Sequence, residues 1–307
     1  MTAMTAVAAI DCGTNSTRLL VADAQGRELT RLMRITRLGQ GVDRDNTLAP
    51  EAIARTVEVL REFRRSMDSF GVDRLRMVAT SAVRDAENGA VFVEAARAAV
   101  GAVPEVLTGL EEGTLAFRGA SADLDPFEGD TLVVDIGGGS TEITLGRAGS
   151  VSSVSLQLGC VRLTERYLTS DPPTPDEVAA TRIAIADALT AGEQRMPALL
   201  GLAARRRLVG LAGTVSTLAS LQLQIAEYDP ERLHHAILTL PEVVALCDTL
   251  GSLSAAQRLG LVGMVPGRAD VILGGALVLE AVAARYRCPE VIVSEKDILD
   301  GIVLSIL

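Results

Sequence analysis

The feature that most constrains the fold of this chain is a glycine-rich turn between two apolar strands. Its clearest copy reads VVDIGGGSTEITLG over residues 133–146, with Gly137, Gly138 and Gly139 in a row. A plain hairpin needs one or two residues that tolerate positive φ, and further glycines weaken a strand because they pack no side chain. The run of glycines therefore predicts a backbone that comes very close to another group.

A second copy of the pattern lies near the N-terminus. The stretch DCGTNSTRLLV, residues 11–21, aligns without gaps on DIGGGSTEITL, residues 135–145. The identical residues are Asp11 with Asp135, Gly13 with Gly137, Ser16 with Ser140, and Thr17 with Thr141. Because an apolar strand precedes and follows each copy, we interpret the two stretches as a duplicated strand–turn–strand unit rather than a chance likeness of two hairpins.

The order of apolar segments predicts an α/β protein with two domains. Successive strands are expected at residues 6–12, 17–24 and 27–36, and again at 131–136, 140–146 and 150–159. Helices are expected over residues 50–70, 91–100, 109–120, 174–200, 214–221, 241–250 and 269–286. The small, acidic segment 119–130 is the expected linker. The domains would then be residues 1–124 and 125–307, with the last helix able to pack on the first of them.

Composition narrows the class of partner. The chain has 307 residues and a formal net charge of -10, which argues against nucleic acid or an anionic membrane surface as the main partner. The four cysteines are far apart and form no CxxC pattern, as in a protein of a reducing compartment. The N-terminus lacks a basic region, and the apolar runs are too short to cross a bilayer. We therefore expect a soluble cytoplasmic protein.

Each turn carries groups that suit a phosphate ligand and a hard cation. Glycine N–H groups can converge on an anion, and hydroxyl groups can add neutral donors. The candidate phosphate-binding residues are Gly13, Thr14, Asn15 and Ser16 in the first turn, and Gly137, Gly138, Gly139, Ser140 and Thr141 in the second. The acids Asp11, Asp135 and Glu142 are candidate ligands, direct or through water, for a cation such as Mg²⁺.

A third stretch, VGLAGTVSTLAS over residues 209–220, places Gly213 and Thr214 where a strand meets a helix. The N-terminus of a helix after small residues suits an anion or the polar edge of a nucleotide. Ordinary N-capping by Thr214 explains the same residues.

Together these stretches resemble the phosphate motifs of the actin-like ATPase and sugar-kinase superfamily. Within it, the chain resembles the exopolyphosphatase and guanosine pentaphosphate phosphohydrolase family, because ATSAVRDAENG, LTGLEEGTLAFRG and VPGRADVILGGALVL follow in family order at residues 79–89, 107–119 and 265–279. The resemblance implies two ribonuclease-H-like α/β domains with a cleft between them. It also implies a phosphoanhydride hydrolase that uses Mg²⁺, with Mn²⁺ as an alternative, and that forms a homodimer.

The resemblance also suggests which residues perform the chemistry. Thr108 and Glu111 match a capping box, so Glu111 has a structural role, while Glu112 points about 100° around the helix. Glu112 matches the family's catalytic glutamate, and Asp135 matches an acid that positions water or metal. Arg84 matches an arginine that reaches the phosphates, although a surface pair with the acid beside it is the alternative. Arg18 is a weaker candidate for the same role.

Other charged residues are interpreted as structural. His234 and His235 adjoin no acidic or cysteine cluster in the sequence, so a metal site there is not expected. Arg205, Arg206 and Arg207 precede a strand and are expected on a solvated edge, with a track for a polyanion as the alternative. Arg268 and Asp270 are expected to form an ion pair at a helix start.

Two departures from the family pattern bear on the substrate. The C-terminal helical domains of longer members are absent, which favours short polyphosphate chains or small nucleotides. Leu299, Asp300 and Gly301 stand where the family commonly has Arg-Glu-Gly, so a site there is in doubt unless Lys296 compensates.

The main functional hypothesis is an exopolyphosphatase that releases orthophosphate from the end of inorganic polyphosphate. Guanosine pentaphosphate 5′-phosphohydrolase activity would use the same machinery. A sugar or acetate kinase and a non-catalytic phosphate or nucleotide sensor are the alternatives from other classes.

Overall fold

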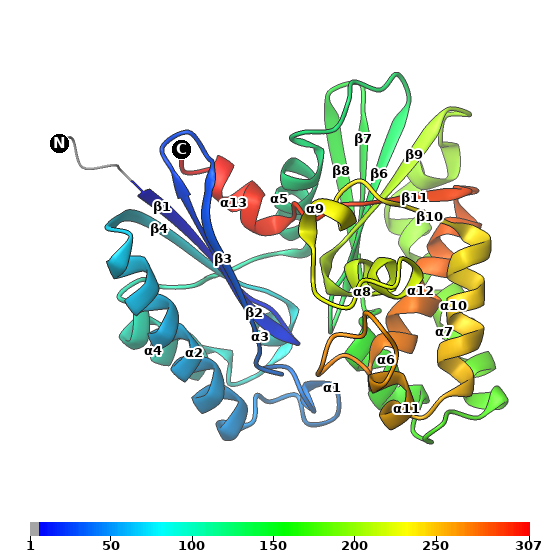
Figure 1. Cartoon of the computed structure of the whole chain (residues 1–307), viewed down its shortest axis with the longest axis horizontal. Helices are drawn as coiled ribbons and strands as arrows, with labels where there is room; N and C mark the ends of the chain where they lie inside the picture. The colour runs from blue at the N-terminus through cyan, green and yellow to red at the C-terminus, as the bar shows by residue number, and fades with distance from the viewer. Residues whose placement is uncertain (1–5) are drawn as a thin grey trace. The chain divides into compact units, whose positions relative to one another are not determined.

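Two mixed β-sheets organise the structure, one in each half of the chain (Figure 1). The computed structural model describes residues 6–307 and separates into two compact units. The first unit contains the chain up to Ala122 and returns at Asp297–Leu307, and the second unit is Asp123–Lys296. The C-terminal helix therefore belongs to the first unit.

The first unit is a 5-stranded sheet with helices on both faces, in the order β3-β2-β1-β4-β5. The strands are β1 (Ala6–Cys12), β2 (Ser16–Asp23), β3 (Glu28–Ile35), β4 (Val72–Ala79) and β5 (Glu105–Val106). The helices are α1 (Val42–Asp45), α2 (Pro50–Ser69), α3 (Ser81–Asp85), α4 (Gly89–Val100), α5 (Gly109–Ser121) and α13 (Ile298–Leu304). Every residue of β1 is buried, as expected for a central strand that is covered on both sides.

The second unit repeats this strand order and adds one strand, giving β10-β11-β9-β6-β7-β8. Its strands are β6 (Asp130–Ile136), β7 (Thr141–Arg147), β8 (Ser150–Leu156), β9 (Arg206–Leu211), β10 (Ile237–Thr239) and β11 (Glu290–Val293). Its helices are α6 (Cys160–Tyr167), α7 (Pro175–Arg195), η1 (Pro197–Gly201), α8 (Ala212–Gln222), α9 (Pro230–Leu233), α10 (Leu240–Ser252), α11 (Ala255–Leu259) and α12 (Ile272–Arg285). The buried α12 packs against α6, α7, α8 and α10.

The two sheets share more than strand order. In each, an antiparallel meander of three strands is followed by a strand parallel to the first, as β1 pairs with β4 and β6 pairs with β9. This is the duplicated architecture that the repeated turn predicts. The apolar stripe of α2 likewise faces the core with Leu60, Phe63 and Met67 fully buried, whereas Phe70 beyond its end is 38% exposed.

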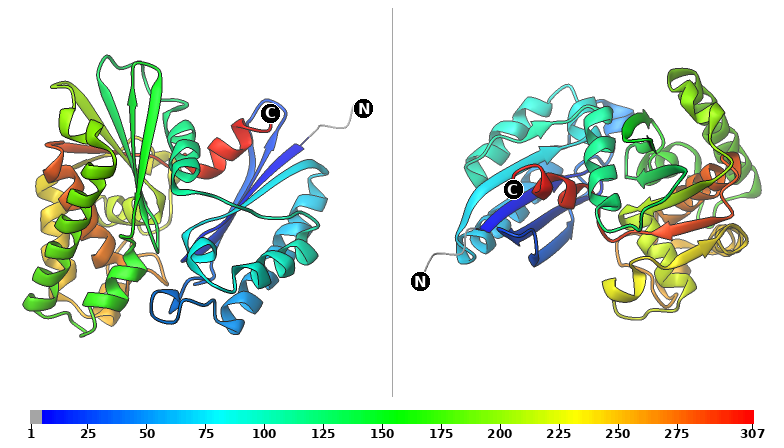
Figure 2. Two further views of the ribbon diagram at one scale, coloured as in Figure 1. Left: turned by 180° about the vertical axis from the view of Figure 1, so that it is seen from behind. Right: turned by 90° about the horizontal axis from the view of Figure 1, so that it is seen from above.

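The predicted linker is wrong at its start. Residues Gly119–Ser121 are the last turn of α5, and Gly119 packs there against the backbone of the segment that leads into α13. A Cβ on Gly119 would lie 1.8 Å from the carbonyl oxygen of Asp297, and one on Gly301 would lie 1.9 Å from that of Leu115. Figures 1 and 2 show α13 beside α5 and against the first sheet. The glycines permit this close approach, which a sequence pattern does not reveal.

Some other expected boundaries also shift. The strand β4 ends at Ala79, and Ser81–Asp85 form the short helix α3. The helix expected to reach residue 200 ends at Arg195 and continues as the 3-10 turn η1. Within residues 6–307, no helix combines the length and apolar character needed to span a membrane.

The packing of α5 on α13 predicts opposite effects for two Gly→Ala changes. Gly301→Ala should lower the stability of the fold by about 1–3 kcal/mol, since the added methyl overpacks a backbone contact. Gly251→Ala, in α10 with open space around its Cβ position, should be neutral or stabilising by about 0.5–1 kcal/mol. Thermal denaturation followed by circular dichroism compares the two, and an unchanged Tm for Gly301→Ala would contradict the close contact.

Candidate active site

The two glycine-rich turns have the same local geometry. The Gly13 N–H donates to the Ser16 carbonyl at 3.0 Å, and the Gly137 N–H donates to the Ser140 carbonyl at 3.0 Å. Each turn joins an antiparallel pair at the end of the buried first strand of its unit. The duplication inferred from the residues is therefore also a duplication of backbone hydrogen bonding.

The start of α6 holds the carbonyl groups of the second turn. The Cys160 N–H donates to the Gly137 carbonyl at 3.0 Å, and the Val161 N–H donates to the Gly138 carbonyl at 2.9 Å. The Arg162 Nε donates to the Gly139 carbonyl at 2.7 Å. Within the described chain, the N–H groups of Gly138 and Gly139 donate to no backbone carbonyl. With their carbonyls turned toward α6, these amides are suited to bind an anion on the other side of the turn.

Gly159, immediately before α6, makes this arrangement possible. A Cβ at this position would lie 2.0 Å from the Gly138 carbonyl oxygen and 2.4 Å from the Gly139 nitrogen. Neither α6 nor the contact of Gly159 is predicted from the sequence. The available signal is a Gly-Cys pair two residues after the third strand of the meander, but its contact with the turn depends on tertiary structure.

The first turn is supported in a comparable way by the segment after β3. The N–H groups of Thr36 and Arg37 donate to the Asn15 carbonyl at 3.0 and 2.9 Å. The Thr14 hydroxyl is already engaged with the Ser81 hydroxyl at 2.9 Å, which leaves it less suited to a ligand than the sequence suggests. The buried Nδ2 of Asn15 has no hydrogen-bond partner within residues 6–307. A buried donor of this kind is costly unless a ligand or water satisfies it.

The acids beside the turns differ between the two units. Asp11 lies directly opposite Arg18 in the β1–β2 pair, whereas Asp135 lies opposite Glu142 in the β6–β7 pair. Opposite residues of an antiparallel pair project from the same face with Cβ atoms about 4.5–5.5 Å apart. The duplicated position thus carries an arginine in the first unit and a glutamate in the second.

Asp11 is buried and bound by its neighbour. Its Oδ2 accepts from Arg18 Nη2 at 2.7 Å and from Arg18 Nε at 3.1 Å. Burial raises the pKa of the Asp11 carboxyl, and the Arg18 charge opposes that rise. Its Oδ1 is buried and has no partner in the described part of the chain. This oxygen could accept from a water or a metal-bound water.

Asp135 and Glu142 provide the acidic pair that best fits a divalent cation. Both are buried, and Glu142 accepts a hydrogen bond from the Ser155 hydroxyl of β8 at 2.6 Å. Two carboxylates at one register position bring their oxygens to the same face of the sheet, where they can share a cation. Rigid carboxylate oxygens are the ligands that Mg²⁺ prefers, so the donor set fits this ion.

The start of α5 separates the roles of its two glutamates. Thr108 and Glu111 form the predicted capping box, with Glu111 Oε2 accepting from the Thr108 N–H at 2.9 Å. That hydrogen bond is the main reason why the pKa of Glu111 is lowered. Glu112 is turned inward and is only 7% exposed. Its Oε2 accepts from Arg84 Nη1 at 3.1 Å.

Arg84 is therefore not a simple surface pair with its neighbour. The same Nη1 donates to the Leu107 carbonyl at 2.9 Å, while Asp85 lies 3.7 Å from Arg84 Nε. The structure brings together Glu112 and Arg84, which the sequence singled out separately. A guanidinium held by a carbonyl and a carboxylate keeps a fixed orientation, from which it can also bind a phosphate oxygen.

The third predicted element differs in its capping. Thr214 lies inside α8, which begins at Ala212 after Leu211, so N-capping by Thr214 is wrong. Ala212 has a φ of 67°, in the left-handed region, at the junction of β9 and α8. The Arg268 guanidinium lies on Gly213, where a Cβ would come within 1.9 Å of its carbon. Arg268 is therefore part of the surroundings of this junction.

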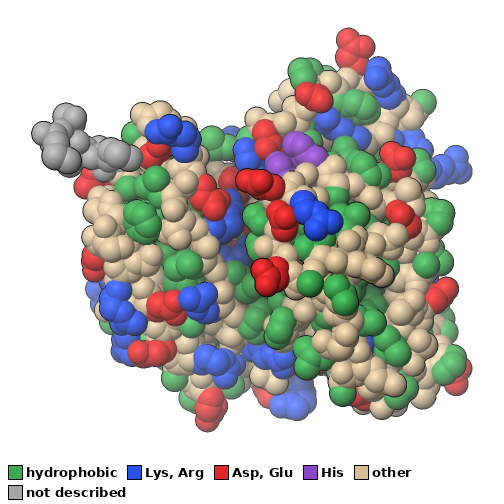
Figure 3. Space-filling view, viewed as in Figure 1, with side chains coloured by type: hydrophobic (Ala, Val, Ile, Leu, Met, Phe, Trp, Pro, Cys, Tyr) green, Lys and Arg blue, Asp and Glu red, His purple; other side chains and the backbone are tan. Residues whose placement is uncertain are grey.

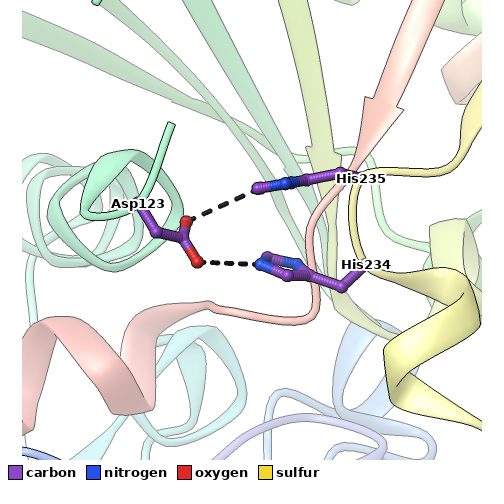
Figure 4. Close-up of side chains that lie close together, drawn as sticks. All are labelled: Asp123, His234 and His235. Carbon is purple, nitrogen blue, oxygen red and sulfur yellow. Dashed lines mark hydrogen bonds and ion pairs between the residues drawn. The ribbon is translucent and has the colours of Figure 1, made fainter. Parts of the chain in front are cut away.

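The histidines do have an acidic neighbour, contrary to the expectation from the sequence. Asp123 Oδ2 lies 2.9 Å from His234 Nε2, and Asp123 Oδ1 lies 3.6 Å from His235 Nε2 (Figure 4). Figure 3 shows the histidines at the surface among acidic and basic side chains. Burial would raise the pKa of Asp123, but hydrogen bonds from His234 and Lys296 outweigh it and hold that pKa low.

The hydrogen bonds of this cluster do not match an open metal site. Lys296 Nζ lies 2.9 Å from Asp123 Oδ2, and the Glu295 N–H donates to His234 Nδ1 at 3.1 Å. A neutral imidazole that accepts at Nδ1 carries its proton on Nε2, the nitrogen that faces Asp123. The cluster is thus an ion pair with hydrogen bonds, and Lys296 is engaged within it.

The three consecutive arginines are largely used within the second unit. Arg206 donates to the carbonyls of Tyr286 and Ala203 at 2.7 and 2.8 Å. Arg205 and Arg207 place their guanidinium groups 5.2 and 4.8 Å from the centre of the Phe127 ring.

Comparisons with known proteins agree with this architecture. The exopolyphosphatase 2 of Mycobacterium tuberculosis is 45% identical over 320 residues, covering 99% of each chain. The crystal structure of an exopolyphosphatase from Cytophaga hutchinsonii matches with a TM-score of 0.89 and 27% identity, over 98% of this chain and 97% of that one. An Aquifex aeolicus member of the Ppx/GppA family matches with a TM-score of 0.80 and 33% identity, over 98% and 97% of the two chains.

These structures confirm the predicted class of two actin-like α/β domains. The sequence model of the Ppx/GppA phosphatase family matches residues 20–307. Matches of this extent, in sequence and in structure, show that the chain belongs to the Ppx/GppA phosphatase family.

Proposed function

We propose that this protein is an exopolyphosphatase that hydrolyses the terminal phosphoanhydride of inorganic polyphosphate and releases orthophosphate. The observation that carries the proposal is the buried carboxylate of Glu112 at the start of α5, which accepts a hydrogen bond from Arg84. The neighbouring Glu111 forms the helix cap instead. The exopolyphosphatase name of the Mycobacterium tuberculosis relative, 45% identical along nearly its full length, supports the same activity.

In this proposal the chain's own groups divide the work. Glu112 accepts a proton from the attacking water while the oxygen of that water bonds to the terminal phosphorus. Arg84 and the amides of Gly138 and Gly139 bind phosphate oxygens and stabilise the charge that develops on them. The bond from phosphorus to the bridging oxygen then breaks, and the shortened chain leaves with that oxygen.

Asp135 and Glu142 would hold Mg²⁺, with Mn²⁺ as a substitute, and the buried Oδ1 of Asp11 would accept from a water. The ion would neutralise phosphate charge, which a protein of net charge -10 needs in order to bind a polyanion.

We also propose a cellular location and an oligomeric state for the protein. The four cysteines are free and buried, which suits a cytoplasmic, reducing setting. A homodimer is proposed on the resemblance alone, and light scattering of the purified protein tests it.

Glu112→Gln should lower kcat for orthophosphate release by about 10²–10⁴, because the amide cannot accept the proton of the attacking water. Glu111→Gln is the matched control: glutamine is tolerated at this capping position, so turnover should stay near that of the wild type. The assay measures orthophosphate from polyphosphates of defined length and from guanosine pentaphosphate. Near-wild-type turnover by Glu112→Gln would remove it from the role of base, and faster release from guanosine pentaphosphate would reassign the substrate.

Activity should depend on the divalent cation far more than on ionic strength. Chelation should abolish turnover, and Glu142→Gln should raise the Mg²⁺ concentration for half-maximal activity by about tenfold or more, since one carboxylate ligand is lost. Raising NaCl moderately should have a smaller effect, because short-range contacts in a buried site are weakly screened. A chelator-resistant activity that falls steeply with NaCl would contradict a metal-assisted site.

Gly159→Ala tests the shape of the second turn. The added methyl would collide with the Gly138 carbonyl and displace the turn, and a displacement of about 1 Å can cost about 10² in rate. Gly201→Ala is the control, because its Cβ position is open. Steady-state kinetics on polyphosphate compares the two variants, and equal kcat/KM values would show that the turn does not bind the substrate.

A further inference from the structure

The start of α13 contributes an unassigned acid to the surroundings of the first turn. Asp297 is the N-cap residue of α13 and is 6% exposed. Its Oδ1 accepts from the Leu299 N–H at 2.8 Å, which completes the helix cap. Its Oδ2 accepts from Arg18 Nη1. One carboxylate therefore caps a helix and also binds an arginine of β2.

Arg18 connects this acid to Asp11. Its Nη1 binds Asp297, while its Nε and Nη2 both donate to Oδ2 of Asp11. A planar guanidinium that is bound along two edges cannot rotate without breaking one of the contacts. Because both bonds from Arg18 reach Oδ2, the buried Oδ1 of Asp11 is left for another donor or for a metal-bound water.

A second arginine fixes α13 itself to the sheet. Arg31 of β3 donates from Nη2 to both oxygens of Asp300, at 3.0 and 2.9 Å, and its Nη1 lies 3.7 Å from Asp297. Burial alone would lower the pKa of Arg31, but the negative charges of Asp297 and Asp300 have the larger effect and raise it. The helix start is thus held in place independently of Arg18.

We propose that Asp297 is a positioning residue for the first turn. It holds Arg18 so that this arginine orients Asp11 without covering Oδ1, and it shares the positive charge of Arg18. Asp11, Arg18 and Asp297 together carry one net negative charge, whereas Asp11 and Arg18 alone would carry none. The first turn thereby keeps an attraction for a cation although an arginine faces its acid. This inference rests on the proposed phosphohydrolase function.

The charge of Asp297 exceeds what a helix cap requires. An N-cap needs one side-chain oxygen that accepts from the backbone, and asparagine serves as well as aspartate. Asp297→Asn therefore keeps the cap and removes the charge that binds Arg18. Asp229→Asn is a matched control, because Asp229 caps α9 through Arg232 N–H and is remote from Arg18 in the chain.

The test combines kinetics on polyphosphate with Mn²⁺ binding measured by electron paramagnetic resonance. For Asp297→Asn we expect a Tm close to that of the wild type. We also expect a loss of kcat/KM of about 10–100-fold and weaker Mn²⁺ binding, as for the loss of an outer-shell partner. Asp229→Asn should leave both readouts unchanged. Wild-type kcat/KM and Mn²⁺ affinity in Asp297→Asn would overturn the positioning role.

Asp300→Ala separates positioning from general loosening of α13. It removes the bond to Arg31 and the hydrogen bond that Asp300 accepts from the Asp297 N–H at 2.9 Å, so it should lower Tm. If Asp300→Ala lowers kcat/KM less than Asp297→Asn does, the effect comes from the negative charge that Asp297 places beside Arg18. An equal or larger loss of kcat/KM in Asp300→Ala would overturn the proposal. Failure of the proposed function would look different, since the wild type itself would then release no orthophosphate.

Discussion

The burial of carboxylates beside the glycine turns is the constraint on which the rest of the site depends. Asp11, Glu112, Asp135 and Glu142 are all more than nine-tenths buried. A buried carboxylate is expensive unless it is paired or hydrogen-bonded. Asp11 is paired with Arg18, and Glu112 with Arg84. In the second unit Asp135 lies opposite Glu142, and Glu142 accepts a hydrogen bond from the Ser155 hydroxyl.

This difference gives the duplicated turns different roles. The backbone of each turn is alike, down to the bond from the glycine amide to the serine carbonyl. The residue opposite the acid differs between the turns, because Arg18 lies opposite Asp11 and Glu142 lies opposite Asp135. We propose that the second turn holds the divalent cation directly, while the first orients its acid through Arg18 and Asp297.

The sequence predicted the features that local pattern encodes. The paired turns follow from identical residues at one spacing, and the cap formed by Thr108 and Glu111 follows from a capping box. It missed features that depend on distant contacts. The bond from Arg84 to Glu112 and the contact of Asp123 with both histidines join residues far apart in the chain. The local sequence around Gly119 is typical of a linker, and its contact with the backbone of Asp297 involves the other end of the chain.

The most direct test of the account is the position of a bound Mn²⁺ ion in crystals of the protein, located by its anomalous scattering. The account predicts a peak at direct coordination distance, about 2.0–2.6 Å, from carboxylate oxygens of Asp135 and Glu142. An ion found instead at Asp123 and the histidines, with no density at the acidic pair, would contradict it.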